Sequence, residues 1–350
     1  MKQPIRYLLF FSFLLSSIVA TAQDKLFTQA FAHPTDLNPA LAGAIDGRYR
    51  VSIAYRDQWQ SFIESPFTTF GVYGDIKIPF GETDDFFGGG FAFVGDRTAV
   101  LNINQNLISL YGSYHKALNA DQKQYLSAGF SFGVAQRSMN YQSIFFNDQF
   151  NGLDEYSLST SENLPFNNFG YADLGLGINY MTGLGEYSGL SFGIAMDHIP
   201  GSSISFYSHS FNQDVEYPDA TLDRKFTTFL SMELASNEYF SVLPRLLYQS
   251  QGSHKMVAAA AVVKFDITNY DTQALHFGGG VRLNQTSTTS LKPSALYVMT
   301  AYEVNGLQIG LSHDITTSNL SSLSPGKGAF ELSISFTGLY ENEESLCPSF

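Results

Sequence analysis

The sequence predicts an all-β protein, namely a transmembrane antiparallel up-and-down β-barrel of about 14 strands with short periplasmic turns and long extracellular loops. Three observations predict this fold. Apolar and polar residues alternate with a period of two through most of the chain. The alternating segments are about 10 to 12 residues long, whereas strands of soluble sheets are typically about 5 to 6 residues long. The connections between them are short and long in turn, as in outer-membrane barrels.

The alternation is clearest near the end of the chain, in residues 306–337. Large apolar residues there alternate strictly with polar ones in the run Phe330-Glu331-Leu332-Ser333-Ile334-Ser335-Phe336-Thr337. Successive side chains of a strand leave opposite faces, so this run is a strand with one apolar and one polar face. Residues 307–312 alternate in the same way, and a Ser/Gly/Pro/Asn loop joins the two segments into a hairpin.

The N-terminus has the features of a secretory signal peptide. Lys2 and Arg6 precede an apolar run that ends in the small residues Ala20-Thr21-Ala22. The run is too short for the alternative, an N-terminal membrane anchor. We therefore predict a signal peptide at residues 1–22 and a mature start at Gln23, without the cysteine that a lipoprotein signal requires.

Charge and cysteine content exclude two classes of protein. The net charge is −13, and removing Lys2 and Arg6 with residues 1–22 changes it to −15, so no nucleic acid is expected as a partner. Cys347 is the single cysteine, so there is no internal disulfide framework.

After the signal, no apolar run reaches the roughly 18 residues of a membrane helix.

Residues 23–47 precede the first strand and do not alternate. They contain Pro34 and the turn signal Asn38-Pro39. We predict a folded N-terminal segment here, either periplasmic or placed as a plug in the barrel. The barrel itself is predicted at 48–337, and a C-terminal periplasmic tail at 338–350.

The barrel segment divides into alternating strands. Pro244 weakens one of them or marks a bulge, and 255–265 lacks clean alternation. The predicted strands are 48–58, 67–78, 86–96, 106–116, 124–138, 169–180, 187–197, 225–235, 239–248, 255–265, 272–284, 294–304 and the two strands of 306–337.

Connection lengths predict which rim of the barrel is which. The two longest connections, 139–168 and 198–224, both follow odd-numbered strands, whereas connections after even-numbered strands are as short as residue 305 alone. Long loops are extracellular and short turns periplasmic in outer-membrane barrels. An even strand count then places both termini in the periplasm, after removal of the signal peptide, and locates the protein in the outer membrane.

Alternation alone also fits a soluble β-sandwich, in which the apolar faces meet each other. Three features favour a barrel in the lipid bilayer. The strands are long, the polar face is rich in Gly and Ser, and aromatic residues occur at strand ends, as interface girdles require. These aromatic residues are Tyr55, Trp59, Tyr114, Tyr180 and Tyr248.

Charged residues of both signs occupy the polar, lumen-facing positions. They can pair to fill the lumen or hold a plug, for which 23–47 is the candidate, or they can line a selective aqueous pore. We favour the filled lumen. The lumen-facing charged candidates are Arg48, Arg50, Arg56, Asp75, Arg137, Asp173, Glu233, Arg245, Arg282 and Glu331.

The sequence carries no recognisable catalytic, cofactor or metal motif. The seven histidines are scattered, and HExxH, GxSxG and paired-cysteine spacings are absent. We therefore predict no enzyme, no cofactor and no metal site. The runs Gly88-Gly89-Gly90 and Gly278-Gly279-Gly280 lie inside strands, so they indicate close packing or a kink in the wall rather than phosphate loops.

Several short stretches, in their order and spacing, resemble the PorP/SprF family of type IX secretion in Bacteroidetes. The resemblance covers residues 23–350 and is carried by Asn38-Pro39-Ala40-Leu41-Ala42-Gly43, Tyr55-Arg56-Asp57-Gln58-Trp59, His276-Phe277-Gly278-Gly279-Gly280-Val281-Arg282, Gly310-Leu311-Ser312-His313-Asp314-Ile315, Gly328-Ala329-Phe330-Glu331-Leu332-Ser333 and Cys347-Pro348-Ser349-Phe350. His313 departs from the pattern, in which an aromatic residue such as Tyr is expected.

The resemblance implies an outer-membrane barrel of the type IX secretion system that helps to export or anchor a secreted surface protein with a C-terminal signal domain. Its implied partners are that protein, secretion components of the outer membrane and periplasm, and the lipid bilayer. Gliding motility is one implied setting. The alternative is a passive porin or hydrophobic-solute transporter. The acidic tail around Cys347 is either a bland exposed segment or a docking tail for a periplasmic partner.

Overall fold

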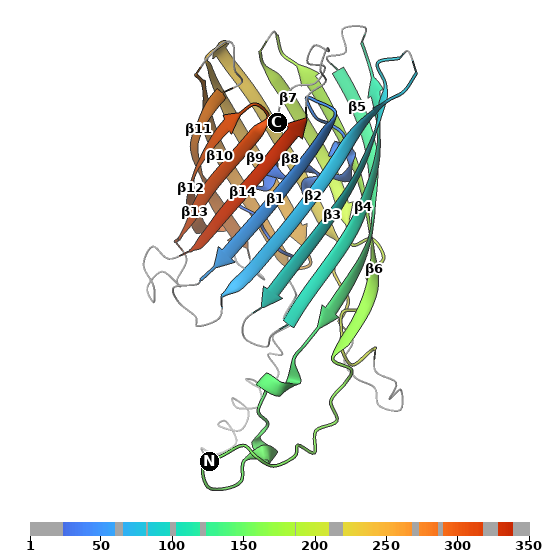
Figure 1. Cartoon of the computed structure of the whole chain (residues 1–350), viewed down its shortest axis with the longest axis vertical. Helices are drawn as coiled ribbons and strands as arrows, with labels where there is room; N and C mark the ends of the chain where they lie inside the picture. Colours follow the sequence, from blue (N-terminus) through green and yellow to red (C-terminus); the bar gives the residue numbers. More distant parts are fainter. Residues whose placement is uncertain are drawn as a thin grey trace, which may run out of the picture.

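A computed structural model describes residues 24–59, 66–81, 83–98, 103–119, 124–185, 187–209, 220–267, 273–285, 290–317 and 328–338. Within these residues the chain forms a closed antiparallel barrel of fourteen strands, in which each strand pairs with its neighbours in sequence and β14 closes on β1 (Figure 1). The predicted signal peptide, most of the C-terminal tail and Cys347 lie outside the described residues. No helix of the described part is long and apolar enough to cross a membrane.

The fourteen predicted strands are confirmed, and the ends of the first twelve differ from the prediction by at most three residues. The strands are β1 (Tyr49–Gln58), β2 (Phe67–Pro79), β3 (Phe86–Thr98), β4 (Ile103–Ala117), β5 (Gln124–Ser138), β6 (Asn168–Gly183), β7 (Gly189–Asp197), β8 (Lys225–Asn237), β9 (Phe240–Gln251), β10 (His254–Asp266), β11 (Gln273–Gln285), β12 (Lys292–Val304), β13 (Leu307–Thr316) and β14 (Ala329–Gly338).

Alternation separates an apolar outer face from a buried inner face. On β1, Tyr49, Val51 and Ile53 are each about two-fifths exposed, whereas Ser52 and Ala54 are buried between them. The same pattern recurs around the barrel, so its outer surface is a continuous band of large apolar side chains. Such a surface is stable in lipid and unfavourable in water. The barrel prediction is therefore confirmed, and the β-sandwich is excluded.

Two irregular strands have simple explanations. Pro244 has no N–H to donate, and the register between β8 and β9 passes from Ser231↔Arg245 to Leu234↔Val242 without pairing Pro244. In β10 the alternation is hidden because small residues lie on both faces. Ala258 and Ala260 face inward, where side chains from residues 24–47 fill the space instead.

The two ends of the barrel differ. The long connections after β5 and β7 leave from one end, which we call the loop-rich rim (Figure 1). Connections after even-numbered strands lie at the opposite end, which we call the short-turn rim. Some of these are very short, as between β12 and β13.

Residues 24–47, which we call the plug, lie inside the barrel (Figure 1). They form three short helical turns, η1 (Ala30–Ala32), α2 (Pro34–Leu37) and η2 (Pro39–Leu41). Leu37, Leu41 and Ala44 are buried against the wall side chains Phe86, Tyr125, Met181 and Phe229, from four different strands. The main apolar core of the molecule is thus the contact between plug and wall.

Candidate functional site

The plug runs through the lumen from one rim to the other. Asp24, where the described chain begins, binds His198 and Lys225, which lie at the loop-rich ends of β7 and β8. At the other end, the Arg48 backbone N–H donates to the carbonyl of Gly338 over 2.8 Å at the short-turn rim. The sequence predicted both termini on one side. The barrel does begin and end at one rim, but Asp24 lies at the other because the plug passes through the lumen.

A buried charged cluster holds the first turn of the plug, and we call it the latch. It consists of Arg56, Arg282, Asp314 and Glu331. The Glu331 carboxylate, which is fully buried, accepts the backbone N–H groups of Thr28 and Gln29, each over 2.7 Å. The latch thus fixes the plug backbone to β14.

Within the latch, charges of opposite sign satisfy one another. The Arg56 guanidinium donates to Asp314 over 2.9 Å and to Glu331 over 3.1 Å, and Arg282 donates to the same Asp314 oxygen over 2.9 Å. The Thr28 hydroxyl donates to Asp314 over 2.7 Å and accepts from both arginines. Two cations and two anions therefore surround one plug residue. Removing one partner of such a buried cluster leaves an uncompensated charge.

A second set of polar contacts holds the plug near the short-turn rim. The Asn38 amide donates to the carbonyls of Ile178 and Ile194 over 3.0 and 3.3 Å, on β6 and β7. The Ala42 carbonyl accepts from Ser113 and His115 over 2.7 and 2.8 Å, on β4. On the other side, the Gly43 N–H donates to Asp75 over 2.8 Å, and that carboxylate also binds Arg50. These contacts reach four wall strands, β2, β4, β6 and β7.

Glycines in the wall make room for the plug. A Cβ atom at Gly88 would overlap the Ala42 carbonyl, and one at Gly129 would lie 2.5 Å from the backbone of Pro39 and Ala40. Cβ atoms at Gly177 and Gly310 would likewise overlap Asn38 and Gln29. Close packing, one of the two predictions made for the glycine runs, therefore explains Gly88. The backbone of the plug lies directly on the wall at Gly88 and Gly129, and plug side chains lie on the wall at Gly177 and Gly310.

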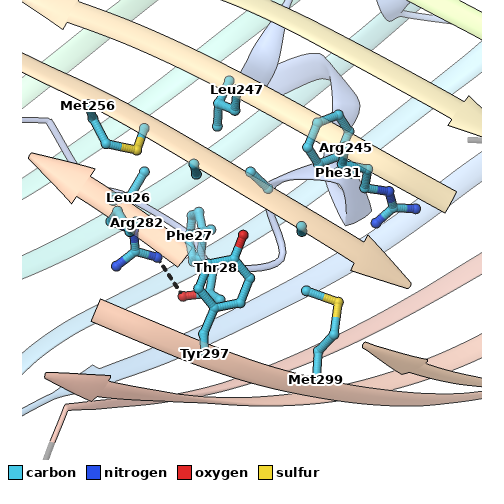
Figure 2. Close-up of a pocket in the computed structure, with 13 residues that line it drawn as sticks. Leu26, Phe27, Thr28, Phe31, Arg245, Leu247, Met256, Arg282, Tyr297 and Met299 are labelled. Carbon is cyan, nitrogen blue, oxygen red and sulfur yellow. Dashed lines mark hydrogen bonds between the residues drawn. The ribbon is translucent and has the colours of Figure 1, made fainter. Parts of the chain in front are cut away.

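Beside the latch, where Thr28 and Arg282 meet, the seam between plug and wall is nearly closed. Figure 2 shows Leu26, Phe27, Thr28 and Phe31 of the plug facing side chains of β9 to β12. The cavity between them measures about 20 Å³, which is room for about one water molecule. The Arg245 guanidinium lies 5.0 Å from the centre of the Phe31 ring, in cation–π geometry.

At the loop-rich end, charged residues hold Asp24, and we call this group the clasp. His198 Nε2 lies 2.8 Å from the Asp24 carboxylate and its Nδ1 lies 3.0 Å from Asp173, while Lys225 lies 2.9 Å from Asp24. Burial alone would lower the pKa of His198, but the two carboxylates outweigh it and raise the pKa to about 9. Burial likewise opposes ionisation of Asp24, yet Lys225 and His198 hold its pKa well below the ordinary value.

Between the latch and the loop-rich rim lies a vestibule, a cavity of about 560 Å³. Its lining is mixed, with the clasp on one side and the apolar residues Tyr171, Ile204 and Leu222 on another. Trp59 also lines it, although the sequence assigned this residue to the lipid-facing girdle. Its backbone φ of +65° ends the alternation of β1, which explains the difference.

The structure places the predicted charged residues as follows. Arg56, Arg282 and Glu331 belong to the latch. Arg50 and Asp75 form an ion pair with each other, and Asp173 belongs to the clasp. Arg137 lines the vestibule, and Arg245 lines the seam. Glu233 lies on the inner face of β8. Arg48 is exposed ahead of β1 rather than enclosed in the lumen.

Sequence reasoning missed several residues of the site. Asp314 continues the inward alternation of Ser312 on β13, so the period-two pattern was sufficient to find it. Asp24, Thr28 and His198 gave no such signal, because the plug and the loop after β7 are not periodic.

Comparison with known proteins agrees with this architecture. The family model for the type IX secretion system membrane protein PorP/SprF matches residues 19–336. No curated protein matches the sequence. Among solved structures, the monoaromatic hydrocarbon channel CymD is similar, with a TM-score of 0.51 at 9% identity, covering 92% of this chain and 95% of that one. A FadL homologue of Pseudomonas aeruginosa has a TM-score of 0.50 at 13% identity, covering 85% and 92%. At these identities the likeness concerns the fold alone.

Proposed function

Because the chain belongs to the PorP/SprF family of type IX secretion system membrane proteins, we propose that it helps the export or surface anchoring of a secreted protein with a C-terminal signal domain. The supporting observation is the plug. It is bonded to the wall at both rims and in between, so the lumen offers no ready path for a folded or unfolded chain. A barrel of this kind serves as a docking platform in the outer membrane rather than as a conduit.

The orientation of the barrel is part of the proposal. The loop-rich rim faces the outside, where a secreted partner arrives, and the short-turn rim faces the periplasm, where other secretion components of the family's system lie. The vestibule then opens toward the cell surface, and the C-terminal end of β14 points to the periplasm. The protein acts without catalysis and without a cofactor.

The alternative is a passive porin or a hydrophobic-solute transporter. The apolar part of the vestibule lining fits a small hydrophobic molecule, but the latch and the seam below it oppose passage. Solute flux through the purified protein, in the absence of any partner, would favour this alternative.

The test is affinity purification of a tagged chain from native outer membranes, followed by mass spectrometry. We expect a secreted protein with a C-terminal signal domain, or a periplasmic secretion component, to co-purify. An untagged strain is the control for adventitious proteins. If neither kind of protein co-purifies while the isolated barrel conducts solutes, the proposed function is wrong.

A further inference from the structure

The connection between β5 and β6 carries an unusual set of exposed apolar residues. We call residues 139–167 the arm. Figure 1 shows the arm extending well beyond the loop-rich rim. Leu153 is 85% exposed and Phe145 is 67% exposed, more than the lipid-facing side chains of the wall. Further exposed apolar side chains of the arm are Phe150, Tyr156, Leu158 and Phe166.

The arm is an ordered hairpin. The Asn151 side chain accepts the N–H groups of residues 153, 154 and 155 over 2.8 to 3.2 Å. Asp148 accepts from the Ser161 backbone and hydroxyl over 2.6 and 2.9 Å, and Phe150 pairs with Tyr156 across the hairpin. The local polar groups thus bond one another, and the apolar side chains are presented outward on a fixed frame.

The neighbouring loop after β7 shows that this exposure is not general at the rim. Its described residues Ile204, Phe206 and Leu222 are each less than a tenth exposed and pack on Phe169 of the wall. In its described part this loop therefore buries three of its apolar residues against the wall and leaves Tyr207 exposed, whereas the arm leaves six exposed. A large exposed apolar patch on a soluble surface marks an interaction site.

The charge of the arm indicates what covers it. It contains Asp148, Asp154, Glu155 and Glu162, and no Lys, Arg or His. Lipid head groups with a net negative charge would be repelled, as would the arm of a second copy of the chain. A protein surface that combines Lys or Arg side chains with apolar residues is complementary to both the negative charge and the exposed apolar side chains of the arm.

We propose that the arm is the docking surface for such a cationic, apolar patch on the secreted partner. The inference rests on the proposed function, because it takes the partner to be the exported protein. The exposed side chains of Phe145 and Leu153 become buried on docking, while Asp154 and Glu155, on the turn at Leu153, attract and orient the basic side chains.

The test places a photo-crosslinking amino acid at position 153 in cells of the native organism. We expect a covalent adduct with a secreted protein bearing a C-terminal signal domain, mapped to a peptide rich in Lys or Arg. The same crosslinker at the lipid-facing position of Leu176 is the control and should give no such adduct. Adducts only with lipid, only with a second copy of the chain, or with no protein at all overturn the proposal.

Two variants measure the apolar and charged contributions separately. Phe145→Ser with Leu153→Ser should lower co-purification of the partner at least about tenfold, since burying even one such side chain is worth about that factor. Asp154→Asn with Glu155→Gln should remove the salt dependence of co-purification. Asn163→Ser, a change of one polar residue for another at an exposed position of the arm, should have no effect.

Co-purification separates the two failures. If the partner binds wild type and the Phe145→Ser, Leu153→Ser variant equally, the arm is not its docking surface, although the proposed function stands. If no secreted protein or secretion component binds wild type, the proposed function fails first. Heat-dependent migration in gels, which reports an intact barrel, checks that each variant is folded.

Discussion

Glu331 is the residue whose alteration tests the plug most directly. Its fully buried carboxylate accepts two backbone N–H groups of the plug over 2.7 Å and the Arg56 guanidinium over 3.1 Å. Glu331→Gln keeps the side-chain volume and one acceptor oxygen but removes the charge. It also replaces the second acceptor with an NH₂ group that faces an N–H donor. Arg56 retains Asp314, so the wall side of the latch is not abolished.

The expected cost follows from these contacts. Hydrogen bonds to a charged group contribute about 1.5–3 kcal/mol, against about 1 kcal/mol for neutral ones, and breaking a buried ion pair costs about 3–5 kcal/mol. Two of the affected bonds belong to the plug. We therefore expect plug docking to weaken by about 3 kcal/mol, which raises the undocked population about a hundredfold.

Two measurements follow the plug. In planar bilayers, the intact protein should have a low conductance, and a variant that lacks residues 24–47 should have a high one. The conductance of the Glu331→Gln variant should lie between these two, with frequent openings. In a Cys347→Ser background, a cysteine introduced at Ala30 should react faster with a bulky thiol reagent when Glu331→Gln is present. Glu238→Gln, the same change at an exposed turn, is the control. High conductance of the intact protein, or identical labelling of Glu331→Gln and wild type, would show that the latch does not hold the plug.

Two further predictions concern the wall and the clasp. Gly88→Ala places a methyl group against the Ala42 carbonyl. It should displace the plug at a cost of about 1–3 kcal/mol and so raise the conductance. Gly89→Ala is the control and should leave the conductance unchanged, because its Cβ would meet only an Ile76 atom, at 3.7 Å. The pKa of His198 is raised from 6.5 to about 9. Its contribution of about 3 kcal/mol is therefore fully present below pH 6.5 and lost as the pH rises through about 9. A nitroxide spin label at Leu26 should become mobile over that range in wild type, and show no such transition in His198→Gln.

The barrel was predictable from sequence because strand alternation is a local property. Each strand shows which residues face lipid, so the inward positions of Arg56, Arg282 and Glu331 follow from their neighbours alone. Their partners do not. Thr28 and Asp314 are 286 positions apart, and they meet only because the barrel closes around a non-periodic segment. No pattern in residues 24–47 encodes which wall residues they contact.

The same distinction explains the individual errors. Trp59 follows a strand whose alternation is regular, but a left-handed backbone at that residue aims its side chain into the vestibule. The exposure of the arm could not be predicted from the sequence either. Its apolar residues are of the same types as those of the next long loop, which include Ile204 and Phe206. Only the fold shows that Ile204 and Phe206 are buried, whereas Phe145 and Leu153 of the arm are exposed.

The energetics of the plug bear on how such a barrel can take part in secretion. The latch and the clasp share no residue, so their contributions should add to a first approximation. At about 3 kcal/mol each, they lower the open population about 10⁴-fold relative to a plug that lacks both. A partner that passed through the lumen would have to bind the open form more tightly by at least this factor. A partner that docks on the loop-rich rim avoids this cost. The plug therefore supports the proposed function, in which the secreted chain takes a route outside this barrel and the barrel serves as its docking platform.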